Sequence, residues 1–156
     1  MVQSNRIANT VLSVRLGANL HAIPIHAVEE VLPALPVEPI PECPEFIRGV
    51  VYVRGHIIPV LDAAERLGLK DHQRQPEPHI ICLRVGGRLI GVEVDEALDL
   101  IEIDPGESAP ASDFGARTGF FSGVIDQDGQ MIRLLDPEKL LADGDAEQLN
   151  GLPQTA

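Results

Sequence analysis

The sequence has few aromatic residues and few basic ones. Aromatic residues make up 3% of the 156-residue chain, and tryptophan is absent. Proteins that bind single-stranded nucleic acid need aromatic side chains on which bases stack and a basic groove along the strand. This chain instead has 12 basic and 24 acidic residues, which gives a formal net charge of −12. Nucleic acid and anionic membranes are therefore not expected partners, which argues against an oligonucleotide-binding barrel.

Cysteines and long hydrophobic runs are also scarce. The two cysteines lie far apart: Cys43 is in a Pro-rich segment and Cys82 is in an apolar run. We expect two reduced thiols rather than a disulfide or a metal site. The first six residues lack the apolar segment of a signal peptide, and no run approaches membrane-spanning length. The sequence therefore predicts a cytoplasmic protein.

Apolar residues are plentiful and the acidic residues are unevenly distributed. A chain of this length with 44% apolar residues can fold as one domain with a substantial core. Residues 1–85 contain 8 basic and 9 acidic residues, whereas residues 86–156 contain 4 basic and 15 acidic residues. The acidic half is either a solvated surface that keeps the protein soluble or a surface that attracts a basic partner.

Short apolar segments separated by Gly and Pro predict an all-β fold with antiparallel strands in a barrel or sandwich. The Pro-rich residues 33–44 resemble an SH3 ligand, but their prolines alternate with apolar residues, which favours a packed loop. Residues 104–119 are expected to form a long loop. The expected strands are 7–16, 20–24, 28–32, the two arms of a hairpin over 47–61, 79–85, 88–94, 97–103, 120–125 and 130–135. The expected helical segments are 25–27, 63–67 and 137–141.

Two stretches of the chain share one pattern. Residues 50–67 and 120–141 each contain a hairpin whose second strand leads into a short helix. An aspartate, Asp62 or Asp136, precedes each helix in the position of an N-cap. This weak internal repeat predicts two similar barrel units in one chain.

No arrangement of polar residues indicates catalysis. The histidines do not form the helical i, i+4 pair of metalloproteases, and no nucleophile elbow or phosphate-binding glycine loop is present. Residues 126–129 resemble part of a calcium loop but lack its later glutamate, so a hairpin turn explains them better. A small β-barrel enzyme or metal-binding protein that uses the region of His21 and His26 remains the alternative function.

Glu30 and Arg54 are candidates for a charge pair. Glu30 lies within the apolar segment 28–32, and Arg54 lies in the turn of the 47–61 hairpin. On a half-buried sheet each charge needs a partner, because an unpaired buried charge is costly. Arginine can offer a carboxylate two hydrogen bonds. The two residues either pair with each other or are solvated independently.

Five segments in order resemble the CheW-like family of bacterial chemosensory adaptors. The hairpin 51–62 contains Val53-Arg54-Gly55 and ends in Pro-Val-Leu-Asp, like the Leu-Arg-Gly hairpin of that family. Tyr52 and Glu96 depart from the pattern, because the family usually has Asn and Gly there. The other similar segments are 23–31, 41–50, 91–103 and 123–141.

The resemblance implies a fold and a domain organisation. The family fold consists of two small five-stranded SH3-like β-barrel subdomains that share a core, with short helices. Residues 1–156 would form a single CheW-like domain. The first barrel would contain residues 18–75, and the second would contain residues 6–17 and 76–143.

The resemblance also implies a function. The protein would be a non-catalytic adaptor without a cofactor or bound metal that links chemoreceptor cytoplasmic tips to the regulatory domain of a CheA histidine kinase, in chemotaxis or twitching motility. Val28 and Glu30 are expected to face outward on one strand. The residues expected to contact the receptor or the kinase are Val28, Glu30, Arg54, Ala97, Leu98 and Leu100.

Overall fold

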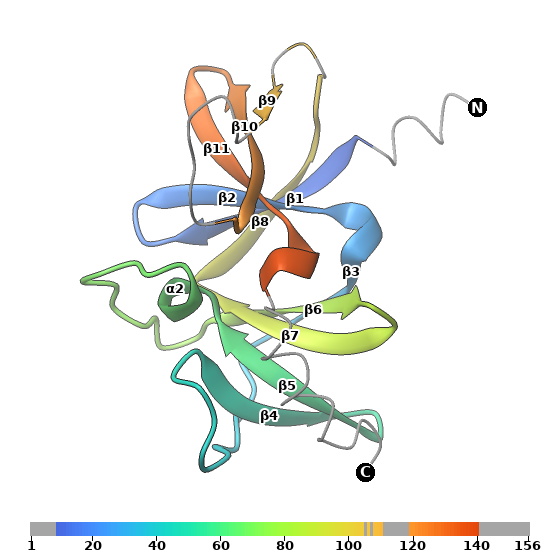
Figure 1. Cartoon of the computed structure of the whole chain (residues 1–156), viewed down its shortest axis with the longest axis vertical. Helices are drawn as coiled ribbons and strands as arrows, with labels where there is room; N and C mark the ends of the chain where they lie inside the picture. Colours follow the sequence, from blue (N-terminus) through green and yellow to red (C-terminus); the bar gives the residue numbers. More distant parts are fainter. Residues whose placement is uncertain (1–8, 105, 107, 111–118, 141–156) are drawn as a thin grey trace.

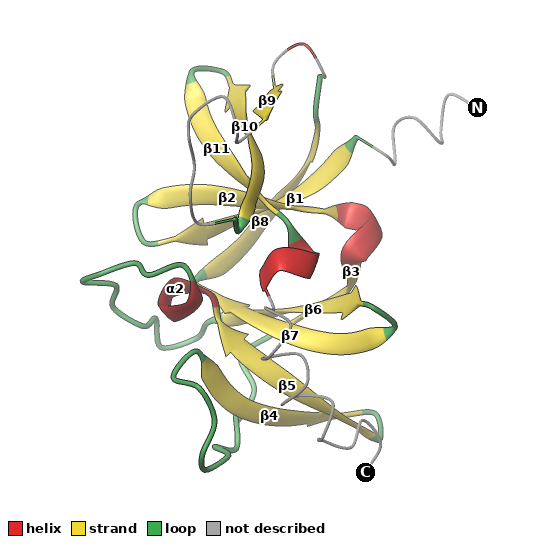
Figure 2. Cartoon of the chain, viewed as in Figure 1, coloured by secondary structure: helices red, strands yellow, loops and turns green. Residues whose placement is uncertain are grey.

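The protein consists of two β-sheets, one above the other in Figure 1. The computed structural model describes residues 9–104, 106, 108–110 and 119–140. Sheet A, the upper one, has the strand order β8-β1-β2-β11-β10-β9. Sheet B, the lower one, has the order β3-β6-β7-β5-β4. The predicted all-β fold class is confirmed, and Figure 2 shows how little of the described chain is helical.

The strands are short and most are joined by tight hairpins. Sheet A contains β1 (Thr10–Leu16), β2 (Asn19–Pro24), β8 (Glu96–Glu102), β9 (Ser108–Pro110), β10 (Phe121–Gln127) and β11 (Gln130–Leu135). Sheet B contains β3 (Val28–Leu32), β4 (Ile47–Val53), β5 (His56–Asp62), β6 (His79–Val85) and β7 (Arg88–Val94). The helical segments are η1 (Ile25–Ala27), α2 (Ala63–Arg66) and η4 (Pro137–Leu140).

The two sheets are built on one plan. In each, an antiparallel hairpin lies at the centre, β1–β2 in sheet A and β6–β7 in sheet B. A second hairpin joins it through a parallel pair, β11 with β2 in sheet A and β5 with β7 in sheet B. An edge strand flanks the central hairpin in each sheet, β8 on β1 and β3 on β6, and sheet A has β9 on β10 in addition. The predicted internal repeat is therefore present as two equivalent units.

The equivalence extends to individual residues. Gly49 pairs with Val60 and Gly123 pairs with Leu134, each just after a shift of register. At both glycines the backbone of another segment of the chain lies very close to the Cα atom. A Cβ on Gly49 would lie 2.0 Å from the Glu38 carbonyl oxygen, and one on Gly123 would lie 2.6 Å from that of Ala109. Only glycine allows either approach without a shift of the backbone.

The two halves of the chain are exchanged between the sheets. After the β1–β2 hairpin the chain crosses through η1 into sheet B, where it forms β3, β4 and β5. After the β6–β7 hairpin it crosses back at Asp95 into sheet A, where it forms β8 to β11. Each sheet is thus assembled from both halves of the sequence, which ties the two units together.

Three hydrophobic clusters follow from this arrangement. The largest lies between the sheets, because β1 and β6 are each buried on both faces: Leu12 and Val14 point to this central core, as do Ile81 and Leu83. A second cluster forms the core of the sheet B unit and includes Ile80 and Cys82. A third fills sheet A and consists of Val11, Ala22, Ile125 and Ile132. The expected shared core is the central one.

The expected division of the chain between the barrels differs from the observed sheets. Residues 19–24 were assigned to the first barrel, but β2 pairs with β1 in sheet A. Residues 79–94 were assigned to the second barrel, but β6 and β7 form the centre of sheet B. The reason is that both strands of each tight hairpin belong to the same sheet. The chain therefore changes sheets only after the β1–β2 hairpin and after the β6–β7 hairpin. Expected residues 6–8 and 141–143 lie outside the described part of the chain.

Most predicted elements are found with small changes at their ends. The strands at 28–32, 79–85, 88–94 and 130–135 and the turn of helix at 25–27 are confirmed, and Asp62 accepts a hydrogen bond from the Glu65 amide as predicted for an N-cap. The loop expected over 104–119 contains the short strand β9, which pairs with β10. Its three residues are too few to give a periodic pattern in the sequence.

Candidate interaction site

Glu30 and Arg54 form the predicted pair. Arg54 Nη2 donates to Glu30 Oε2 over 2.6 Å and so joins the tip of the β4–β5 hairpin to the edge strand β3. Arg54 has a left-handed backbone with φ of 49°, and Gly55 follows with φ of 80°, as in a tight two-residue hairpin turn. The hydrogen bond and the negative charge of Glu30 both raise the pKa of the Arg54 guanidinium.

The pair is more exposed than the sequence argument required. The Arg54 side chain is 72% exposed and the Glu30 side chain is 30% exposed. The expectation that burial forces the two charges together is therefore wrong, because the arginine remains in water. An exposed ion pair adds little to stability. The main effect of the Glu30–Arg54 pair is to hold the β4–β5 hairpin tip against β3.

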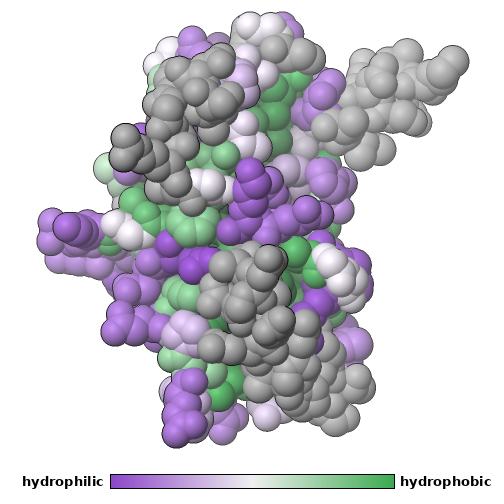
Figure 3. All heavy atoms as spheres, in the orientation of Figure 1, coloured by the Kyte–Doolittle hydropathy of each residue, from purple (hydrophilic) through white to green (hydrophobic). Residues whose placement is uncertain are grey.

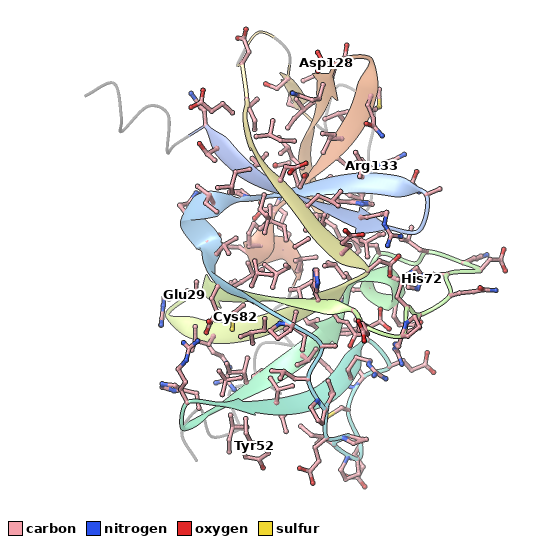
Figure 4. All side chains as sticks on the ribbon, turned by 180° about the vertical axis from the view of Figure 1, so that it is seen from behind. Glu29, Tyr52, His72, Cys82, Asp128 and Arg133 are labelled. Atoms are coloured by element: carbon pink, nitrogen blue, oxygen red, sulfur yellow. The ribbon has the colours of Figure 1, made fainter. Side chains whose placement is uncertain are left out.

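A second ion pair lies beside the first on the same strand. Arg84, near the β6–β7 turn, donates from Nε to Glu29 Oε1 over 2.6 Å. Cys82 lies in β6 near these charges, and burial, followed by the charges of Glu30 and Glu29, raises the pKa of its thiol to about 11. It is an unreactive core thiol, as expected. Figure 4 shows Glu29 and Cys82 at the same side of the molecule.

The expected orientation of Val28 is wrong. Val28 is half-buried and packs against the central core, and Leu32, four residues further along β3, is buried in the core of sheet B. The outward side chains of the strand are instead Glu29 and Val31, and Val31 is 41% exposed. Alternation along a strand identifies two faces but not which face is inward. Here the inward face bridges the central core and the core of sheet B.

Strand β8, which carries three of the candidates, is equivalent in position to β3. Ala97 pairs with Val14 and Leu100 pairs with Leu12, just as Val28 pairs with Leu83 and Val31 pairs with Ile81. Ala97 is half-buried like Val28. Leu98 is 37% exposed and Leu100 is 63% exposed. The candidates thus form two groups, one on each edge strand, rather than one cluster.

The arrangement of His21 and His26 does not support the alternative metal or enzyme function. His21 is buried and stacks on Phe121 with ring centroids 5.9 Å apart, whereas His26 is exposed in η1. Burial, together with the charge of Arg133, lowers the pKa of His21 to about 4. Among the described residues, no group of three or more potential ligands converges on one point.

The polar hollow beside α2 is lined by charged residues that pair with one another or with neighbouring residues. It has a volume of about 570 Å³ and lies between α2 and the loop that follows it. Arg74 there donates to Asp62 over 2.8 Å and lies 3.1 Å from the buried Glu93. His72 is 2.8 Å from Asp95, whose other oxygen accepts from the Gly17 amide over 2.7 Å. These contacts fix the crossover and its loop.

One arginine joins the two units. Arg66 of α2 lies between the rings of Phe46 and Phe120, with its guanidinium carbon 4.2 Å and 4.9 Å from their centroids. Its Nε donates to the Leu140 carbonyl over 2.7 Å. Phe46 and Phe120 are themselves equivalent, since their carbonyls accept from the amides of Asp62 and Asp136. Arg66 is not among the residues predicted from the sequence, because its ring partners are distant from it in sequence.

The molecular surface is mixed in character. On the face in Figure 3, green hydrophobic areas are separated by purple hydrophilic ones. Within the described part of the chain, no helix is both long enough and apolar enough to span a membrane. Among the residues that the structure describes, the exposed large apolar side chains are Val31, Tyr52, Leu98, Leu100 and Met131.

The fold and the distribution of its exposed groups define a double-barrel scaffold, with two SH3-like subdomains of β-strands. The family model described as CheW-like domain matches residues 10–145. The chain belongs to the CheW-like family, and its relatives place it among the chemosensory coupling scaffolds.

Individual relatives agree with this assignment. The chain is 28% identical over 138 residues to a chemotaxis protein CheW of Rhizobium meliloti (strain 1021), covering 87% of this chain and 89% of the relative. It is 32% identical to protein FrzA of Myxococcus xanthus, with 81% of each chain covered. The crystal structure of scaffolding protein TtCheW from Thermoanaerobacter tengcongensis has a TM-score of 0.81 and 28% identity, covering 88% of this chain and 95% of that one.

Proposed function

We propose that this protein is a non-catalytic cytoplasmic adaptor, formed as a single CheW-like domain, that links chemoreceptor cytoplasmic tips to the regulatory domain of a CheA-type histidine kinase. The membership of the CheW-like family supports this proposal. The observation that carries it is the location of the exposed chemistry. Ion pairs and apolar side chains lie on two edge strands and a hairpin tip, where partner proteins can reach them.

The six candidate residues have different roles in this proposal. Glu30 and Arg54 hold the β4–β5 tip in the orientation that the kinase or receptor contacts. Leu98 and Leu100 offer apolar contacts on β8 to the receptor tip. Val28 and Ala97 support the two edge strands from the core and contact a partner only through their exposed fractions.

Titration of the purified protein with two partners tests the proposal. One partner is a CheA regulatory domain and the other is a receptor-tip fragment, both from the organism that carries this chain. We expect saturable 1:1 binding to each and a ternary complex when all three are mixed. Absence of binding to both partners under conditions in which the chain is folded would contradict the adaptor function.

A further inference from the structure

Two histidines contact the place where the chain crosses from β7 of sheet B to β8 of sheet A. His72 belongs to the loop after α2, and its Nε2 lies 2.8 Å from Asp95 Oδ1. His79 begins β6, and its Nδ1 accepts a hydrogen bond from the Ala97 amide over 2.9 Å. Figure 4 shows His72 on its loop, beside this crossover. Neither histidine is one of the six candidate contact residues.

His79 connects the two sheets. Its backbone pairs with Val94, the last residue of β7, and its side chain bonds to Ala97 of β8, three residues further along the chain. Both His79 and Ala97 are half-buried, so water reaches this contact only in part. The hydrogen bond therefore holds the beginning of the sheet A edge strand to the central hairpin of sheet B.

The direction of this hydrogen bond determines the protonation state of the His79 ring. The Ala97 amide can only donate, so the ring nitrogen that it contacts must carry a lone pair. A neutral imidazole has one such nitrogen, whereas an imidazolium has none. With a proton on His79 Nδ1, two N–H groups would face each other and the amide would lose its acceptor, which is costly for a half-buried group. The contact is therefore possible only when the ring is neutral.

The contact of His72 with Asp95 has a different requirement. The Asp95 side chain is 3% exposed, and its other oxygen accepts from the Gly17 amide over 2.7 Å. His72 donates to the carboxylate, which both a neutral ring with a proton on Nε2 and an imidazolium can do. A second proton on His72 leaves this contact in place and adds charge to it. Proton uptake thus removes one histidine contact at the crossover and keeps the other.

Charged groups surround His79 on several sides. The ring lines a hollow of about 430 Å³ together with Arg15 of β1, Glu77 of the preceding loop, Asp95 and Glu96. Arg15 lies 3.6 Å from Asp95 and 3.5 Å from Glu96, and on β7 the pairing partner Val94 is uncharged. Histidine is the residue type that ordinarily gains a proton between pH 8 and pH 5, whereas carboxylates and guanidinium groups ordinarily keep their charge there.

We propose that His79 is a pH-sensitive connection between the two units: its neutral ring holds the start of β8 to β6, and proton uptake releases it. The release is local, because the Asp95 amide still donates to the Arg15 carbonyl over 3.1 Å and the Gly17 amide still donates to Asp95. The start of β8 therefore loosens while the crossover itself stays in place. The inference does not depend on the proposed adaptor function.

Amide hydrogen exchange of the purified protein tests the inference, with the ring nitrogen shifts of His79 followed by NMR over the same pH range. Exchange is expressed as a protection factor, relative to an unstructured peptide at the same pH. The protection factor of the Ala97 amide should fall by roughly tenfold or more from pH 8 to pH 5, with a midpoint that coincides with the titration of His79. The Gly17 amide is the internal reference at the same junction, and its protection should change by less than about twofold.

Three variants separate the two histidines. His79→Asn puts a non-titrating amide oxygen where Nδ1 accepts, so Ala97 protection at pH 8 and pH 5 should agree within about twofold. His79→Leu removes the acceptor and should give low protection at both values. His72→Gln keeps a donor for Asp95 but removes the other titrating ring, and should retain the pH dependence of the wild type.

Each outcome decides the inference. A pH dependence of Ala97 protection that is lost in His79→Asn and kept in His72→Gln supports it. It would be overturned by unchanged Ala97 protection while the His79 ring titrates, or by a ring that takes up no proton between pH 8 and pH 5. A parallel loss of protection at Gly17 would also overturn it, because the whole junction would then open. If His79→Asn does not fold, the wild type and His72→Gln still provide the comparison.

Discussion

The β4–β5 and β10–β11 hairpins occupy equivalent places in the two sheets, but their tips carry opposite charges. Both begin with a register shift, both join the neighbouring hairpin through a parallel pair, and both lead into a short helix. One tip has Arg54, paired with Glu30, and the other has Asp128. Glycines and backbone hydrogen bonds preserve the fold of both units, whereas the residues at the two tips differ in charge.

The largest effect on the free energy of unfolding, and the largest difference in it between the two units, is expected at their equivalent glycines. Gly49→Ala should lower the free energy of unfolding by about 4 kcal/mol or more. The new Cβ meets the Glu38 carbonyl at 2.0 Å, and φ at this position is 145°. Gly123→Ala should cost about 2 kcal/mol, because its contact with Ala109 is longer, at 2.6 Å. Urea unfolding of both variants measures this, and equal losses would contradict the structural difference.

The buried His21 gives the stability of sheet A a dependence on pH. His21 pairs with Val14, and its equivalent is Ile90, which pairs with Leu83. Because the pKa of His21 falls from 6.5 to about 4 on folding, the unfolded chain binds the proton more readily. The free energy of unfolding therefore decreases as the pH is lowered from 6.5 to 4, by about 3 kcal/mol from this group.

His21→Ile places the sheet B residue in sheet A and should remove this contribution. Carboxylates also titrate in the range, so the test compares the wild type with the variant by denaturant unfolding at pH 7 and pH 4. The variant should lose about 3 kcal/mol less than the wild type. Identical losses would show that His21 does not titrate between these values.

Arg66 is expected to stabilise the junction of the two units by a smaller amount. Arg66→Leu removes two cation–ring contacts and the hydrogen bond to Leu140. We expect a loss of about 2 kcal/mol in the free energy of unfolding. Arg66→Lys keeps the charge but not the planar group between two rings, and should show an intermediate loss. A lysine variant as stable as the wild type would mean that charge alone suffices at this position.

The smallest expected effect on stability is at the Glu30–Arg54 pair. Arg54→Glu places two negative charges together, but at an exposed site, so the melting temperature should change little. Binding of the kinase domain or receptor tip should still weaken, roughly fivefold, because the hairpin tip is no longer held against β3. The exchanged pair Glu30→Arg with Arg54→Glu should recover part of this affinity. Unchanged binding in the single variant would show that the tip has no part in either contact.

The sequence predicted local features better than their assembly. Alternation and turn residues predicted the strands of both central hairpins. Charge within apolar segments made Glu30 and Arg54 candidates for a pair, and the structure contains that pair. The assignment of strands to sheets was wrong because exchange of the two halves leaves no local signal. The predicted orientation of β3 was wrong for a similar reason. Whether the side chain of Val28 points toward a core depends on strands that are distant in sequence.

The equivalence of β3 and β8 was also beyond the local patterns. The sequences around Val31 and Leu100 differ. The two residues are shown to correspond by their cross-strand pairing, Val31 with Ile81 and Leu100 with Leu12.

The most direct test of the adaptor function is co-sedimentation with receptor-containing vesicles. A CheA regulatory domain is mixed with vesicles that carry the full-length chemoreceptor, with and without this protein. We predict that the kinase domain sediments with the vesicles substantially more when this protein is present, and that Arg54→Glu reduces the added fraction. Sedimentation of the kinase domain that does not depend on this protein, together with no binding of the protein to the vesicles, would contradict the account.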